Sequence, residues 1–227
     1  MAKQEIGDLE QIRQKLEGWL ASRIPNVEDF TLGELNFPEF SGESSVTLIM
    51  EANWQEAGRA RHERFVLRMA PIISQVFETH DLKLQYQLME VMNKEGIPAP
   101  SLVGYEPDSS LLGSDFYVMD FVDGIVPPDN PPMAFGSWVS ELTTEERATM
   151  WHNGLTTMAK IHQIDIRQYD LPSLEESPAD QSPLAHEITR YEGMMKQGMR
   201  EKADPIILEA WQYLKDNLPA DGPRRLV

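Results

Sequence analysis

The chain has 227 residues and is strongly acidic, with 20 lysines and arginines against 37 aspartates and glutamates and a formal net charge of −17. Such a surface repels the phosphate backbone of nucleic acids and anionic membranes, so we expect neither as a partner. The absence of cysteine excludes disulfides, thiolate metal sites and thiol catalysis. No stretch is long and apolar enough to span a bilayer, and the first residues are polar, so we predict a cytoplasmic protein.

The first part of the chain predicts a helix followed by a β-hairpin. Near the N-terminus, apolar residues recur at spacings of three and four, which is typical of one amphipathic helix that ends near Ile24-Pro25. Residues 26–36 show no clear pattern. The alternation over 46–51 and the apolar run over 65–69 predict two strands, and the polar segment 53–61 predicts the hairpin tip between them.

A second helix and two further strands follow. Leucine and methionine side chains form one stripe over 81–95, and the segment Gly96–Pro100 stops the helix. Apolar runs at 102–105 and 116–121, joined by a polar turn, read as strands. The chain up to about residue 122 therefore predicts a small α+β lobe around an antiparallel sheet.

The second half of the chain predicts helices. Thr143 and Glu146 form a capping box, and the helix after it is expected to carry its apolar stripe inward, at Trp151, Leu155, Met158 and Ile161. A second stripe consists of Leu184, Ile188, Tyr191 and Met195. Asp204-Pro205 marks the start of a third helix, as an N-cap followed by proline at the first helical position. Leu226-Val227 reads as the start of a strand.

Two stretches suggest a ligand site. Asp115–Gly124 reads as a buried strand that runs into a turn and then into a proline-rich segment, which leaves backbone N–H and C=O groups free to bind the edge of a flat ring such as adenine. Phe40–Thr47 is rich in serine and glycine, and small side chains let backbone N–H groups approach phosphate oxygens. An ordinary core strand before a loop, and a plain hairpin entry, are the alternative interpretations.

The order of a mixed lobe, a strand that leads into a linker, and then helices resembles the protein-kinase-like fold. The local sequences are similar to the aminoglycoside phosphotransferase and choline kinase family, and most of all to the phosphotransferase domains found with acyl-CoA dehydrogenases. The resemblance covers roughly residues 12–227 and implies an α+β fold. It also implies a nucleotide-binding lobe at 1–122, a hinge and linker at 123–142, and part of a helical lobe at 143–227.

The resemblance also implies the role of each site residue. The phosphate-covering loop corresponds to Ser41, Gly42, Ser44 and Ser45. Arg68 occupies the place of the strand lysine that pairs with phosphates, and its permanent charge and forked geometry suit that role. Gln85 stands where the family has a glutamate, so we expect a neutral version of the usual Lys–Glu pair. Met119 would lie behind adenine, with the Asp120 carbonyl and the Val122 N–H on its edge.

The chain departs from the family at its catalytic motif. No His-Gly-Asp or Asp-Phe-Gly sequence occurs in the 227 residues, so this chain offers no counterpart of the catalytic aspartate or of the magnesium ligands. The resemblance implies ATP as cofactor, magnesium as its usual companion, and a small hydroxylated molecule as acceptor, such as an aminoglycoside, a choline-like alcohol, a sugar or a hydroxyacyl group. We expect the 227-residue chain to be inactive alone.

Two alternatives remain open at this point. The chain could be a non-catalytic nucleotide-binding or protein-interaction module on a kinase-like lobe. It could also be a structural protein that binds no nucleotide, in which Arg68 and Gln85 form a polar pair in the core.

Overall fold

The computed structural model describes residues 7–38, 45–70, 81–128, 132–133, 136–171, 178, 181–199 and 204–220. The chain divides into two compact units, Met1–Tyr169 and Asp170–Arg225. The first contains a five-stranded antiparallel sheet with helices, and the described part of the second is helical, so the predicted α+β class is confirmed. The predicted division of the chain near residues 122 and 142 stays a prediction.

The elements follow one another in this order: α1 (Leu9–Arg23), β1 (Glu28–Leu32), β2 (Val46–Glu56), β3 (Arg59–Met69), α2 (Leu82–Lys94), β4 (Leu102–Glu106), β5 (Phe116–Asp120), α3 (Trp138–Glu141), α4 (Thr144–Gln163), a 3-10 turn (Ile166–Gln168), α5 (Pro183–Met199) and α6 (Pro205–Asp216).

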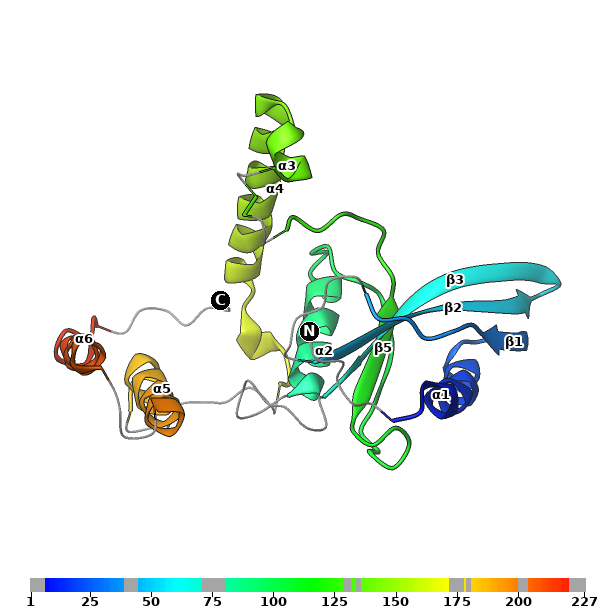
Figure 1. The fold of residues 1–227 in the computed structure, drawn as a ribbon, viewed down its shortest axis with the longest axis horizontal. Coiled ribbons are helices and arrows are strands. Elements are labelled where there is room, and N and C mark those ends of the chain that lie inside the picture. The colour runs from blue at the N-terminus through cyan, green and yellow to red at the C-terminus, as the bar shows by residue number, and fades with distance from the viewer. Residues whose placement is uncertain are drawn as a thin grey trace. The chain divides into compact units, whose positions relative to one another are not determined.

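The sheet has the strand order β1-β2-β3-β5-β4 (Figure 1). The hairpin of β2 and β3 is longer than the sequence predicts, because the two strands stay in register up to the pair Glu56↔Arg59. Its turn is only Ala57-Gly58, and both residues have positive φ, as a two-residue turn that matches the twist of the strands requires. The segment 53–61 is polar because this end of the hairpin is largely exposed. It was predicted as the hairpin tip, but most of it belongs to the paired strands.

Strand β1 was missed in the sequence. It pairs with β2, but its register shifts between Glu28 and Thr31, and Asp29 adopts a left-handed backbone with φ 53°. A bulge of this kind breaks the alternation of inward and outward side chains. The period of two that identifies a strand is therefore absent from residues 26–36.

Helix α1 covers one face of the sheet. It begins at the N-cap Asp8 and buries four side chains, Ile12, Leu16, Trp19 and Leu20, against strand residues that alternate with exposed or half-buried ones. The Trp19 ring meets Phe116 of β5 edge-on, with ring centroids 5.0 Å apart. Gly104 of β4 allows this approach, because a Cβ there would lie 3.2 Å from the indole ring. This contact places the main hydrophobic core between α1 and the sheet.

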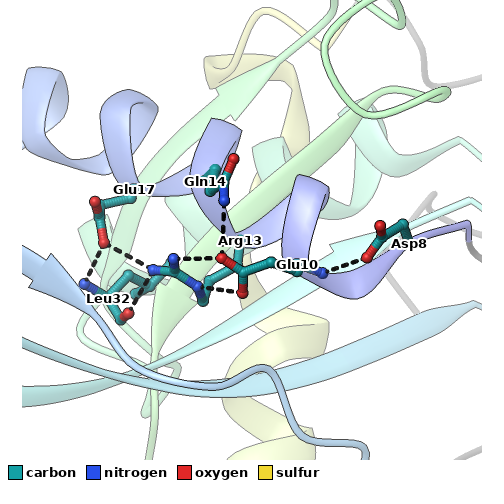
Figure 2. Close-up of polar contacts among 6 residues, drawn as sticks. All are labelled: Asp8, Glu10, Arg13, Gln14, Glu17 and Leu32. Carbon is teal, nitrogen blue, oxygen red and sulfur yellow. Dashed lines mark hydrogen bonds and ion pairs between the residues drawn. The ribbon is translucent and has the colours of Figure 1, made fainter.

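Polar contacts bind α1 to the edge strand β1 (Figure 2). Arg13 donates to the Leu32 carbonyl at 2.9 Å, and Glu17 accepts from the Leu32 N–H at 2.8 Å. Arg13 also pairs with Glu10 and Glu17, and this holds the pKa of Glu10 well below its ordinary value, at about 2. The backbone groups of an edge strand that would otherwise be unpaired are thus satisfied by the helix.

Helix α2 lies on the opposite face of the sheet. The ring of Tyr86 contacts the rings of Tyr105 on β4 and Tyr117 on β5. Since successive side chains of a strand point to opposite faces, Tyr117 faces α2 while its neighbour Phe116 faces α1. Figure 1 shows the two helices on either side of the sheet.

The helices after β5 confirm the predicted caps but not the predicted burial. Thr143 and Glu146 form the capping box of α4, and Asp204 caps α6 with proline at its first turn. Trp151, Leu155 and Met158, which were expected to point inward, are exposed among the described residues. The spacing of a stripe indicates that a helix has an apolar side, but it does not indicate what covers that side.

Three further findings concern the second half of the chain. A short helix, α3, lies in the linker that was predicted to be irregular. The predicted strand start at Leu226-Val227 lies outside the described residues. In the part of the chain that the structure describes, no helix is both long enough and apolar enough to cross a membrane.

The packing of α1 makes a direct stability prediction. Leu16 is fully buried in the core, so Leu16→Ala should reduce the free energy of unfolding by about 2–5 kcal/mol through lost burial and the remaining cavity. Gln14→Ala, on the exposed side of the same helix, should change it by no more than about 0.5 kcal/mol. Urea unfolding of both variants measures the difference. Equal losses would show that α1 does not pack on the sheet as described.

Candidate functional site

The candidate site is built on a row of four polar side chains that crosses the sheet on the α2 face. The register pairs Thr47 of β2 with Arg68 of β3, Arg68 with Tyr117 of β5, and Tyr117 with Tyr105 of β4. Side chains that are paired across antiparallel strands lie on the same face and within reach of one another. One arginine is therefore placed between two hydroxyl-bearing side chains, Thr47 and Tyr117, in the middle of the sheet.

The guanidinium of Arg68 is held by hydroxyl groups. One terminal nitrogen, Nη2, donates to Ser45 Oγ in a short hydrogen bond, and the other, Nη1, lies 3.3 Å from Thr47 Oγ1. Ser45 is 4% exposed and directly follows the serine- and glycine-rich segment. The third nitrogen, Nε, is buried and has no hydrogen-bond partner among the described residues. The side chain thus keeps an unused donor.

No carboxylate pairs with Arg68 among the described residues, although the chain carries 37 of them. Six arginines show the contrast, because each contacts an aspartate or a glutamate: Arg13, Arg23, Arg61, Arg64, Arg167 and Arg190. Arg147 instead donates to backbone carbonyls. Because neutral groups surround this guanidinium, its positive charge is not compensated and can attract an anionic partner. The arrangement is suited to receiving an anion.

Arg68 and Gln85 were expected to form a neutral version of the usual Lys–Glu pair. Both residues are described, and no hydrogen bond joins them; Gln85 Oε1 instead accepts from the hydroxyl of Tyr117 at 3.4 Å. The place of Gln85 on the sheet side of α2 was predicted, but its partner was not. Tyr117 is the cross-strand neighbour of Arg68 and bonds Gln85, whereas its sequence context marks it only as a strand-forming residue.

The two tyrosines of the row differ in their surroundings. Burial and the acceptor Asp115 raise the pKa of Tyr105 to about 12. Burial also raises the pKa of Tyr117, and the charge and hydrogen bonding of Arg68 offset part of that rise. Both phenols are therefore protonated at neutral pH. Tyr117, but not Tyr105, has its oxygen next to the guanidinium.

The end of β5 presents the backbone groups that the sequence analysis singled out. Met119 and Asp120 are half-buried, and Val122 is 63% exposed. The Asp120 N–H donates to the Ser101 carbonyl at 2.9 Å. The N–H and C=O of a strand residue point to the same side, so the Asp120 carbonyl also faces the side of the sheet on which Ser101 lies. The Val122 N–H has no hydrogen-bond partner within the described residues.

Arg64 of β3 fixes the segment that follows β5. Its carbonyl accepts from the Phe121 N–H at 2.9 Å, its guanidinium lies 4.0 Å from the centre of the Phe121 ring, and it forms an ion pair with Asp123. Three contacts from one residue hold the backbone on both sides of Val122. The free N–H of Val122 is therefore presented from a defined backbone. Arg64 gives no signal in the sequence, because its role depends on the strand register.

The other predicted loop residues, Ser41, Gly42 and Ser44, lie outside the described residues. Of the four residues of the predicted loop, the structure therefore places only Ser45, which it brings into contact with Arg68. Thr47 was missed as a contact of Arg68 because its position opposite the arginine follows from the register of β2 and β3. Within the described residues, no group of three or more His, Asp or Glu side chains is arranged to hold a metal ion.

Comparison with known proteins points to one family. The model of the phosphotransferase enzyme family matches residues 53–227. Acyl-CoA dehydrogenase family member 11 of Gallus gallus is 24% identical over 207 residues, which cover 91% of this chain and 24% of that protein. Acyl-CoA dehydrogenase family member 10 of Mus musculus is 25% identical over 115 residues, 51% of this chain and 10% of that protein. The chain thus spans a quarter or less of the length of these curated relatives.

A solved structure shares the fold. A crystal structure from Ralstonia eutropha JMP134, described as an aminoglycoside phosphotransferase, superposes with a TM-score of 0.60 at 20% sequence identity. The match covers 92% of this chain and 54% of that one. The predicted resemblance, including the likeness to domains that accompany acyl-CoA dehydrogenases, is confirmed. The chain belongs to the phosphotransferase enzyme family, and it has the α+β, protein-kinase-like fold.

Proposed function

We propose that this chain binds ATP and serves the ATP-dependent transfer of a phosphoryl group to a hydroxyl of a small molecule. Membership of the phosphotransferase family supports the reaction class. The observation that carries the nucleotide site is Arg68, a cation with neutral partners and an unused buried donor next to the end of the serine- and glycine-rich loop. In this proposal its guanidinium meets the phosphate groups of the nucleotide.

The charge of the whole chain makes a local cation necessary. At a net charge of −17 the protein repels an anionic nucleotide at long range. Binding must therefore come from short-range contacts, which are strongest for a charge-assisted hydrogen bond in a partly buried place. Arg68 meets both conditions, because it is partly buried and no carboxylate of the described residues neutralises it.

The base of the nucleotide would bind at the end of β5. We place the adenine edge against the Asp120 carbonyl and the Val122 N–H, with Met119 behind the ring. The free N–H of Val122 and the backbone held by Arg64 support this placement. Ser41, Gly42 and Ser44 would cover the phosphates together with Ser45. The acceptor is a hydroxyl compound in this proposal, and the relatives do not define it further.

We expect ATP to stabilise the protein in a thermal shift titration, and Arg68→Met to weaken ATP affinity at least about tenfold, the effect of losing one charge-assisted hydrogen bond. Adenosine affinity should change less than about twofold, because it has no phosphate group. The matched control is Arg61→Met on the same strand, whose arginine is exposed and pairs with Glu56.

Two outcomes would contradict this prediction. If the wild-type chain shows no shift with ATP, ADP or adenosine, with or without magnesium, the nucleotide site does not exist. If Arg68→Met binds ATP as the wild type does, the site does not use this cation. Circular dichroism of the variants separates a binding loss from a folding loss, and Arg68→Lys, which keeps the charge but loses the fork, should bind with intermediate affinity.

We also expect the 227-residue chain to bind ATP without consuming it. The chain has no His-Gly-Asp or Asp-Phe-Gly sequence, so it offers no counterpart of the family's catalytic base and metal ligands, which orient the nucleophile and neutralise charge in phosphoryl transfer. An assay of ATP consumption with magnesium and a panel of hydroxyl compounds should give the rate of the protein-free blank. Turnover above that blank would show that other residues of this chain supply the chemistry.

A further inference from the structure

Tyr117 connects the cation of the candidate site to the helix that covers it. It is the cross-strand partner of Arg68, and its side chain is 3% exposed. Its hydroxyl donates to Gln85 Oε1 of α2 at 3.4 Å, and its ring meets that of Tyr86 on the same helix. Tyr117 is therefore the strand neighbour of Arg68 and contacts α2 through both its hydroxyl and its ring.

The hydroxyl of Tyr117 has the right chemistry to serve two partners at once. A phenol has one O–H to donate and lone pairs to accept with. Burial raises the pKa of Tyr117, so the group keeps its proton at neutral pH, and Arg68 acts on the same oxygen by charge and hydrogen bonding. The proton can then point to Gln85 while a lone pair faces the guanidinium.

Gln85 is uncharged, so it cannot hold the guanidinium of Arg68 by an ion pair. A glutamate at this place could hold a guanidinium directly by charge, whereas an amide oxygen is neutral and attracts it weakly. The two terminal nitrogens of Arg68 are already directed toward Ser45 and Thr47. Neither of these contacts comes from β5, the strand that carries Tyr117 beside Arg68.

We propose that Tyr117 is the positioning residue of Arg68: its hydroxyl accepts from the guanidinium and donates to Gln85, so that α2 sets the direction of the charge through a neutral relay. This inference rests on the proposed nucleotide site only for its effect on binding. The relay itself is a property of the free protein.

Tyr117→Phe removes the hydroxyl and keeps the ring. Tyr105→Phe is the matched control, because Tyr105 is the neighbour of Tyr117 in the same row and contacts the same Tyr86 ring, but its hydroxyl bonds Asp115. Gln85→Leu removes the other end of the relay. If both residues act through one chain of contacts, the double variant Tyr117→Phe with Gln85→Leu should weaken ATP affinity no more than the more damaging single variant does.

The first measurement needs no nucleotide. The side-chain Nε–H signal of Arg68, identified in a nitrogen-15 NMR spectrum by its loss in Arg68→Lys, should shift or exchange faster with water in Tyr117→Phe and in Gln85→Leu. In Tyr105→Phe the Arg68 signal should keep its chemical shift and its exchange rate. An Arg68 signal that is unchanged in Tyr117→Phe would overturn the relay, whether or not the protein binds nucleotide.

The second measurement tests the consequence for binding. Tyr117→Phe should weaken ATP affinity about tenfold, the size of one hydrogen bond to a charged group, and leave adenosine affinity within about twofold of the wild type. Equal loss for ATP and adenosine would show a general packing defect and overturn the positioning role. If the Arg68 signal responds but no nucleotide binds to the wild type, the relay stands and the proposed function fails.

Discussion

The packing of α1 on one face of the sheet is the constraint on which the rest of the structure depends. Leu16, Leu20 and Trp19 fill that face, and the edge contact of Trp19 with Phe116 brings the helix against the centre of the sheet. Because buried apolar side chains occupy this face, polar side chains of the strands can gather only on the opposite face. The row that contains Arg68 and Tyr117 lies there, with α2 over part of it.

On that second face, the site combines a permanent charge with neutral partners. Most arginine ion pairs of this acidic chain lie at its surface, where they contribute little to stability. Arg68 is different, because hydroxyl groups orient it without cancelling its charge. Such an arrangement costs stability through an incompletely satisfied buried guanidinium, and a bound anion would offset that cost.

The backbone of β5 and the segment that follows it are held by different kinds of contact. The strand itself is held by β3 and β4 on its two sides, while the segment beyond it is held by a single residue, Arg64, through a backbone hydrogen bond, a ring contact and an ion pair. The ion pair involves a largely exposed carboxylate and is screened by salt, whereas the ring contact and the backbone hydrogen bond are not. The order of this segment therefore rests mainly on the backbone hydrogen bond and the ring contact of Arg64.

The sequence by itself determined the fold class, the family and most of the elements. Helix stripes, caps and strand alternation are local properties, so α1, α2, β4, β5 and the capping box of α4 could be located from residue spacing alone. The same spacing put Arg68 on a strand and Gln85 on the apolar side of a helix. It also showed that neither His-Gly-Asp nor Asp-Phe-Gly occurs among the 227 residues.

Only the tertiary structure decided which of these residues meet. Thr47, Arg68, Tyr117 and Tyr105 share a row because of the strand register, and a shift of one residue would turn Tyr117 to the opposite face. For the same reason Gln85 bonds Tyr117, the cross-strand neighbour of Arg68, rather than Arg68 itself. A bulge removes the alternation that would identify β1. Register and bulges arise from pairing between distant segments, so they leave no signal in the local spacing of residues.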